Sequence, residues 1–363
     1  MSVLAAIAVL ALLIVVHEFG HFSAARLQNI RVNRFSIGFG PILLKKQGPE
    51  TEYAIRAFPL GGFVGFPDDD PDSEIPPDDP DLLRNRPILD RAIVISAGVI
   101  ANLIFAYFLL VSQSAILGVP ESANPQPGVI VTQIISSDSP AGRANLQAGD
   151  RILAIDNRPL QASEEAAKVF KQTIETSANQ SLNLTVKRGK EQLAIALTPD
   201  ADKAGKGKIG IGLAPNFELI RRPPNSIFEA FIVGAKEFQR MSVLTTKGFA
   251  QLIGNFQETA QQVASPVKIV QIGSDLAKSD AGSLFQFGAL ISINLAIINI
   301  LPLPALDGGQ LAFLLLEGLR GKPVPSRIQD GVMRTGLVLL LGLGMFLIVR
   351  DTTNLAIFQQ LLP

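Results

Sequence analysis

The sequence predicts a multi-span α-helical membrane protein that carries one small external α+β domain. Hydrophobic residues make up 47% of the 363 positions and charged residues only 18%, which is typical of a membrane protein rather than of a soluble domain. Four segments are apolar and long enough to cross a bilayer. The region between the second and the third segment alternates between apolar and polar residues, as β-strands do.

The first apolar segment, expected to be a transmembrane helix over residues 1–27, contains the most informative motif of the chain. Residues 3–16 are all apolar, and the only two histidines, His17 and His21, follow directly with a glutamate between them. Positions i and i+4 share one face of a helix, so the two imidazoles can bind one zinc ion. Glu18 lies on the adjoining flank, where it can take a proton from water.

A motif this short also arises by chance, and buried histidines are often satisfied core residues. Three ionisable groups in a lipid-embedded helix, however, cost of order several kcal/mol unless they have partners. The chain has no cysteine, so any further metal ligand has to be a carboxylate. A zinc site is therefore the favoured interpretation. With 32 basic and 32 acidic residues the net charge is zero, and no nucleic-acid partner is expected.

A loop over residues 28–87 follows the first span. Two strand-like stretches at 35–44 and 53–64, each punctuated by glycines, predict a β-hairpin that contacts the membrane or the site. The alternative is an ordinary glycine-rich loop. The acidic, proline-rich run at 68–81 lacks the glycine and the closing glutamate of an EF-hand, so we expect a solvated, mobile loop there.

The second span is expected over residues 88–117, and loop charges predict its orientation. Arginine and lysine are frequent in the loop after the first span and in the loop before the fourth, which places both loops in the cytoplasm. The long region between the second and third spans is then external. The two histidines should lie toward the cytoplasmic end of the first helix.

The external region begins with a proline- and glycine-rich linker at 118–128. A helix is expected around 164–173, and together with four short strands it makes an α+β domain over 125–215. The expected strands are 129–134, 152–155, 182–186 and 193–197. Amphipathic helices that lie in the membrane interface are expected within 226–283.

The third span, expected over residues 284–320, is interrupted by Pro302 and Pro304. Irregular backbone at membrane depth is tolerated where it is buried in protein or lines a wet cavity. Asp307 follows this break and is the best candidate for a third zinc ligand, although it could also be an exposed cap beside two glycines. A fourth span is expected over 331–350.

At this point the chain resembles a known family. The histidine motif together with the run Asn-x-x-Pro-x-Pro-x-x-Asp-Gly-Gly at 299–309 is similar to the site-two protease family of intramembrane zinc metalloproteases, in its bacterial RseP-like branch. Segments 38–40 and 59–64 resemble the membrane-associated cytoplasmic β-hairpin of that family, and 128–160 resembles a PDZ domain. Some relatives have two PDZ domains, whereas one is evident in this chain.

The resemblance implies a role for each matching residue. His17, His21 and Asp307 would bind Zn²⁺, and Glu18 would be the general base. Asn299 matches an asparagine that helps to bind substrate or to stabilise the oxyanion, and Asn294 would assist it; the alternative for both is interhelical hydrogen bonding.

Gly62 and Phe63 belong to the hairpin that would bind an extended substrate by strand addition. Gln310 occupies a position that is often histidine in the family.

The implied function is zinc-dependent intramembrane proteolysis of single-span membrane proteins, such as anti-sigma factors or remnant signal peptides. The implied location is the cell inner membrane, with the lipid bilayer around the spans, the active site toward the cytoplasm and the PDZ domain outside, where it could take a peptide ligand. Two other classes of function are kept open: a PDZ membrane scaffold with a non-catalytic metal site, and a metal-ion transporter. The scaffold has no need of Glu18, and a transporter would need polar residues at several depths of the bilayer.

Overall fold

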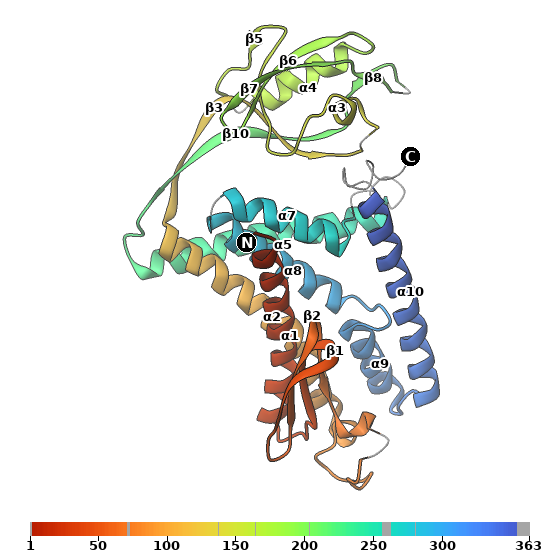
Figure 1. The fold of residues 1–363 in the computed structure, drawn as a ribbon. Coiled ribbons are helices and arrows are strands. Elements are labelled where there is room, and N and C mark those ends of the chain that lie inside the picture. Colours follow the sequence, from red (N-terminus) through yellow and green to blue (C-terminus); the bar gives the residue numbers. More distant parts are fainter. Residues whose placement is uncertain are drawn as a thin grey trace. The chain divides into compact units, whose positions relative to one another are not determined.

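The computed structural model describes residues 2–70, 73–136, 138–163, 165–202, 204–255, 263–279 and 281–353 (Figure 1). The chain divides into two compact units. The first combines Met1–Gly118 with Pro224–Thr352, and the second is built on Val119–Pro223.

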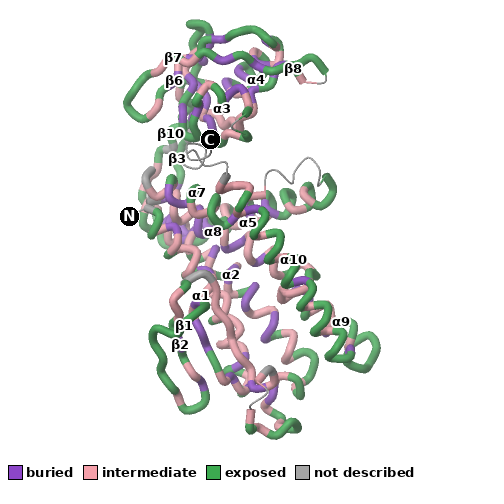
Figure 2. The backbone as a smooth tube through the Cα atoms, turned by 45° about the vertical axis from the view of Figure 1, so that its right-hand side comes forward, coloured by how far each residue is buried: buried purple, intermediate pink, exposed green. Residues whose placement is uncertain are grey.

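Seven α-helices of the described chain belong to the first unit. They are α1 (Ser2–Leu27), α2 (Ile88–Leu117), α5 (Ile227–Gly254), α7 (Pro266–Ser279), α8 (Ala281–Ile300), α9 (Asp307–Arg320) and α10 (Ser326–Thr353). Within the described residues, α1, α2, α8 and α10 are long and apolar enough to cross a membrane, which confirms the four predicted spanning helices. Most residues of α10 are exposed (green in Figure 2), as expected of a helix whose apolar surface faces lipid.

Helix α2 is the centre of the first unit, because it packs against α1, α5 and α8. Its contacts with α5 and α8 form a small buried cluster around Ala106, Leu110 and Ile293. A Cβ at Gly20 of α1 would lie 2.5 Å from the carbonyl oxygen of Ala97, so the backbones of α1 and α2 are in direct contact. Small residues permit such close approach between membrane helices.

Strands β1 (Arg34–Gln47) and β2 (Glu52–Gly65) are both bent, and together they form a sheet of four rows beside α1 (Figure 1). The rows lie in the order 62–65, 34–37, 52–55 and 42–47. The first row is an edge, because its pairing within the described residues is with β1 alone. Several large apolar side chains of this sheet are exposed, namely Phe39, Ile42, Leu43, Leu44 and Phe58. Contact of the sheet with the membrane stays a prediction.

The acidic run after β2 forms ion pairs with arginines, and the mobility that the sequence predicts for this solvated loop stays a prediction. Its ion pairs include Asp68–Arg84, Asp70–Arg34, Asp79–Arg31 and Asp81–Arg86. The backbone amide of Arg31 also donates to the carbonyl of Asp81 at 2.9 Å. The described part of this loop is therefore folded against the residues that precede β1; Pro71 and Asp72 lie outside the described residues.

The second unit is an α+β domain with an antiparallel sheet in the order β10-β3-β4-β6-β7, and β5 pairs with β4. Its elements are β3 (Val119–Ile134), α3 (Pro140–Arg143), β4 (Arg151–Ile155), β5 (Arg158–Pro159), α4 (Ala166–Thr176), β6 (Leu182–Arg188), β7 (Glu191–Leu197), β8 (Asp200–Ala201), β9 (Gly207–Lys208) and β10 (Ile211–Arg222). Phe170 and Ile174 on one face of α4 are buried in the core of this unit, as the period of an amphipathic helix requires. Residue 164, expected to begin this helix, lies outside the described residues.

One ion pair in this domain is almost completely buried on its acidic side. Asp150 accepts hydrogen bonds from Nε and Nη2 of Arg188 at 2.8 and 2.7 Å. These bonds raise the pKa of the Arg188 guanidinium above its ordinary value. The two-pronged geometry joins the turn before β4 to the end of β6.

The segment expected as a linker at 118–128 is instead the first part of a long strand. Strand β3 runs without interruption to Ile134 and pairs with β10 along most of its length, from Val119 opposite Arg222 onward. Prolines are compatible with strands where their missing amide faces away from a partner. Proline and glycine content alone therefore gave the wrong prediction here.

Candidate metal centre

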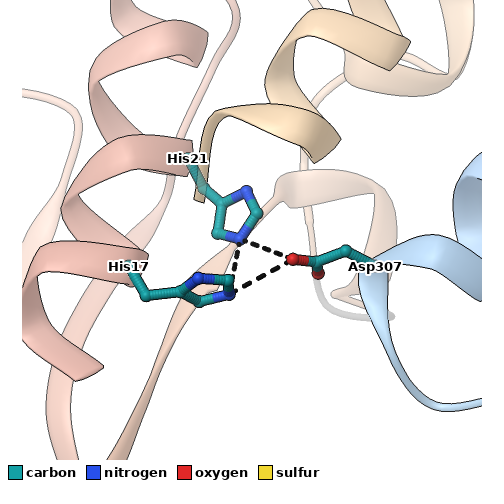
Figure 3. A group of neighbouring side chains, drawn as sticks. All are labelled: His17, His21 and Asp307. Atoms are coloured by element: carbon teal, nitrogen blue, oxygen red, sulfur yellow. Dashed lines mark hydrogen bonds and ion pairs between the residues drawn. The ribbon is translucent and has the colours of Figure 1, made fainter. Parts of the chain in front are cut away.

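The helical period of α1 brings the two histidines onto one face. Their ring centroids lie 4.7 Å apart and the ring planes are nearly perpendicular, at 89°. Both imidazoles point toward the start of α9, where the Asp307 carboxylate meets them (Figure 3). Residues separated by 286 positions or more in the chain are thus neighbours in space.

The three side chains place one ligand atom each at the corners of a small triangle. Nε2 of His17 lies 3.2 Å from Nε2 of His21 and 3.2 Å from Oδ2 of Asp307, and Nε2 of His21 lies 3.5 Å from the same oxygen. Ligands around tetrahedral zinc, at bond lengths of 2.0–2.1 Å, are separated by about 3.3 to 3.4 Å. The observed triangle therefore has the size of one face of a zinc coordination tetrahedron.

Hydrogen bonds elsewhere on the ring determine which nitrogen of His21 is free for a metal. Nδ1 of His21 donates to the backbone carbonyl of Val94 on α2 at 2.9 Å. In a neutral imidazole this leaves Nε2 unprotonated, with its lone pair facing Asp307. Oδ2 of Asp307 is buried and has no hydrogen-bond donor within the described residues. Lone pairs that converge in this way need a cation between them, and the donor set suits zinc.

Asn102 of α2 supports His17 in the same manner, although sequence reasoning did not identify it as a site residue. Nδ2 of its side-chain amide lies 3.3 Å from Nδ1 of His17, and its backbone carbonyl accepts a hydrogen bond from Oγ of Ser292 at 2.8 Å. Oδ1 of Asn102 is buried without a donor in the described chain. The amide orientation that turns this oxygen toward a protonated Nδ1 satisfies both groups and leaves Nε2 of His17 for the metal.

Gly98, one turn before Asn102, is the second residue that sequence reasoning missed. A Cβ at this position would lie 2.3 Å from Nε2 of His21 and 2.7 Å from Cε1 of His17. The backbone of α2 therefore forms one wall of the site, and a side chain there would displace the imidazoles. The available signal was a glycine and an asparagine spaced by four within an apolar span.

Asp307 is brought to the site by the proline break between α8 and α9. Helix α8 ends at Ile300, and Asp307 is the first residue of α9. A Cβ at Gly308 would lie 2.1 Å from the carbonyl oxygen of Leu301, and one at Gly309 would lie 2.4 Å from that of Leu303. The two glycines therefore let α9 begin directly against the end of α8.

Glu18 lies next to the edge row of the β1–β2 sheet. The backbone amide of Val64 hydrogen-bonds to its carboxylate, and a Cβ at Gly62 would lie 3.0 Å from its Cγ. The predicted substrate-binding pair Gly62 and Phe63 thus belongs to the row that contacts the predicted base. The Phe63 ring itself packs under Arg56, whose guanidinium carbon lies 5.5 Å from the ring centroid.

The two asparagines of α8 differ in their relation to the site. Nδ2 of Asn299 lies 3.2 Å from Nε2 of His17, so its amide borders the metal position. Asn294 is half-buried and lies about 140° around the helix from Asn299. No hydrogen bond joins Asn294 to the metal triangle within the described residues.

Comparison of the sequence with known protein families shows to which family this chain belongs. The family model described as Peptidase family M50 matches residues 5–343. The chain belongs to peptidase family M50. M50 peptidases are zinc-dependent metalloproteases, so the predicted cofactor is confirmed, as is the resemblance to site-two proteases. The ligand set described above fits that metal.

Relatives of similar length carry matching names. A protein of Nostoc sp. (strain PCC 7120) named as a zinc metalloprotease is 65% identical over 98% of this chain and 97% of its own. The Membrane metalloprotease ARASP, chloroplastic, of Arabidopsis thaliana is 48% identical over 99% of this chain and 81% of its own. These names and the four apolar helices agree with a membrane-bound metalloprotease.

The PDZ domain of an SdrC-like protein from Listeria monocytogenes matches 24% of this chain and 86% of its own length, at 28% identity and a TM-score of 0.21.

Proposed function

We propose that this chain is an intramembrane zinc endopeptidase that cleaves transmembrane segments of membrane-tethered proteins. One observation carries the proposal. Two imidazoles and a carboxylate direct unprotonated ligand atoms at one point, and the two histidines lie on a helix apolar enough to span a membrane. Glu18, which is not part of the ligand triangle, lies on the flank of that histidine-bearing helix. Zinc, when bound there, would act as a Lewis acid that acidifies water and polarises a peptide carbonyl.

The residues of the chain would perform the remaining chemistry. Glu18 would take a proton from the attacking water and return it to the leaving amine. The Val64 amide, which holds the Glu18 carboxylate, would orient the base for this transfer. The Asn299 amide, which borders the metal position, would donate a hydrogen bond to the developing oxyanion. Asn294 would contribute indirectly, by positioning α8 or the substrate.

A substrate helix has to unwind before its carbonyls can be attacked, because they are engaged in hydrogen bonds within the helix. The edge row of the sheet, with Gly62 and Phe63, would add such an extended segment as a further strand beside Glu18. Its contact with Glu18 supports this role.

The fold of the second unit supports a filter on substrate access. A PDZ-like α+β domain outside the membrane would exclude substrates with bulky external parts, or bind the peptide end of one already shortened. Anti-sigma factors and remnant signal peptides are the substrate classes that the site-two family suggests. The active site would then face the cytoplasm of a cell whose inner membrane holds the protein, in line with the basic residues of the loop after α1.

The experiment that tests the proposal uses purified full-length protein reconstituted in lipid vesicles with a single-span test substrate. Wild type should release cleavage products, a chelator should abolish the activity, and added zinc should restore it. Glu18→Gln should lower kcat by about 10²- to 10⁴-fold while zinc stays bound, because the base is lost but no ligand is. A protein that binds zinc yet cleaves no membrane-spanning substrate would favour the alternative of a PDZ scaffold with a non-catalytic metal.

A further inference from the structure

The loop that delivers Asp307 to the metal centre is held from outside by α10. Residues 301–306 contain two prolines, which have no amide hydrogen to donate. The amides of Leu301, Leu303 and Leu306 donate to carbonyls within 298–303, so their hydrogen bonds are local. Ala305 differs, because its amide donates to Sδ of Met333 on α10, at 3.3 Å and 28 positions further along the chain.

Ala305 also has an unusual backbone conformation. Its φ is +70°, in the left-handed region that residues with a Cβ rarely adopt. The loop therefore does not hold this conformation by its own preference. A contact from outside the loop is needed to hold Ala305 at positive φ. Ala305 lies two residues before Asp307, the proposed metal ligand.

Helix α10 contacts this point of the loop closely. Met333 and Gly336 lie three residues apart and thus on one face of the helix. A Cβ at Gly336 would lie 2.2 Å from Cβ of Pro304 and 2.8 Å from its carbonyl carbon, so only a glycine allows the helix to come so near. Met333 is half-buried beside this contact, whereas much of the remaining apolar surface of α10 is exposed.

We propose that Met333 is a positioning residue for the metal centre. Its thioether accepts the Ala305 amide and so holds Ala305 left-handed, which directs the Asp307 carboxylate at the two imidazoles. The inference rests on the proposed metalloprotease function and adds to it an element, α10, that supplies no ligand. Because a thioether is a weak acceptor, the effect should be modest and should depend on the strain at Ala305.

The test measures zinc affinity of purified full-length protein by competition with a chromophoric chelator, together with the visible spectrum of the cobalt-substituted protein. Met333→Leu removes the acceptor and preserves the volume of the side chain, so the fold should survive. We expect zinc affinity to fall by about three- to tenfold, which is less than the roughly 10- to 100-fold typical of losing a direct hydrogen-bond partner of a ligand, and we expect altered cobalt bands. Met345→Leu is the matched control, since Met345 is on the same helix and 63% exposed.

Replacement of Ala305, the strained residue, distinguishes a positioning role of Met333 from a role in packing alone. Glycine adopts positive φ without penalty, so Ala305→Gly should bring the affinity of the Met333→Leu variant back to within about twofold of wild type. A loss of packing would persist in the double variant. The inference would be overturned if Met333→Leu left zinc affinity unchanged or lowered it no more than Met345→Leu does. It would also be overturned if Met333→Leu lowered zinc affinity equally with alanine and with glycine at position 305.

Failure of the inference and failure of the proposed function remain distinguishable. Zinc affinities that follow the expected pattern in a protein without peptidase activity would uphold Met333 and refute the protease. Cleavage that depends on zinc, with no influence of Met333 on affinity or on the cobalt spectrum, would refute Met333 alone. If wild-type protein bound no zinc, both would fall together.

Discussion

Hydrogen bonds on the far side of each imidazole decide which nitrogen of His17 and His21 faces Asp307. The Val94 carbonyl and the Asn102 amide are both supplied by α2. The Val94 carbonyl fixes Nδ1 of His21 as a donor, and the Asn102 amide does the same for Nδ1 of His17 when its Oδ1 faces the ring, so that each Nε2 is free for a metal. The proposed metal centre would therefore depend on residues that supply no ligand.

Removal of the Asn102 amide tests this dependence. In Asn102→Ala the Nδ1 hydrogen of His17 loses its acceptor, so zinc affinity should fall by about 10- to 100-fold. A chelator competition assay on purified protein measures the change. Asn294→Ala, in the neighbouring helix, is the control and should bind zinc as wild type does; equal affinities for all three proteins would show that Asn102 has no orienting role.

At this scale the sequence identifies the candidate ligands better than the residues that hold them in place. His17, His21 and Glu18 were predictable because a membrane span rarely contains ionisable groups, and Asp307 because it follows a proline break. The roles of Asn102 and Gly98 were not predictable in the same way. They arise from the contact between α1 and α2, which the sequence of one helix does not specify.

At the scale of elements, the edge row of the β1–β2 sheet packs against α1 beside Glu18, the predicted base. Gly62 contacts Glu18, and the same row pairs with β1 on its other side. The sheet thereby places a strand edge directly beside the predicted base. Position 62 tolerates little more than a hydrogen atom, because a Cβ would also lie 2.9 Å from the Ser36 carbonyl oxygen.

Gly62→Ala should therefore displace Glu18 without disturbing the metal ligands. We expect kcat on a single-span substrate to fall by about 10- to 100-fold, since a shift of about 1 Å in a catalytic group has this effect. Zinc affinity should stay at the wild-type value. Gly248→Ala on α5 is the control, as a Cβ there meets nothing within 4 Å; full activity of Gly62→Ala would argue against this contact as a determinant of catalysis.

The spanning helices were predictable from the sequence, because each is a long apolar run. Strands whose extent depends on pairing with distant strands were not. Long apolar runs predict the four spanning helices, because the length of a run and its lack of charge suffice. The first half of β3 was missed because its prolines and glycines indicate a linker, while its partner β10 lies far along the chain. The four rows made from two bent strands likewise depend on long-range pairing.

For the molecule as a whole, each of the two units has its own buried core. The second unit is closed at its base, because Val119 at the start of β3 pairs with Arg222 at the end of β10. Its core includes Phe170, Ile152 and Leu184, all nearly or fully buried. A domain whose ends meet can be removed with little effect on the fold of the remainder.

Excision of residues 120–221, with a short glycine linker in their place, tests the filter role of this domain. The shortened protein should retain zinc and should cleave full-length substrates that wild type rejects. Substrates already shortened outside the membrane should be cleaved at similar rates by both proteins. The measurement is the ratio of kcat/KM for the two substrate lengths; an unchanged ratio in a folded, zinc-loaded variant would make the domain a passive spacer.

The proposed chemistry depends on one zinc ion that two distant parts of the chain share within a membrane protein. Metal analysis of the purified protein tests this claim most directly, with Asp307→Asn as the decisive variant. We predict one zinc per chain in wild type, and a loss of affinity of about 10³-fold or more in the variant, because one of three protein ligands is weakened and its charge is removed. Zinc bound as tightly by Asp307→Asn as by wild type would contradict the account.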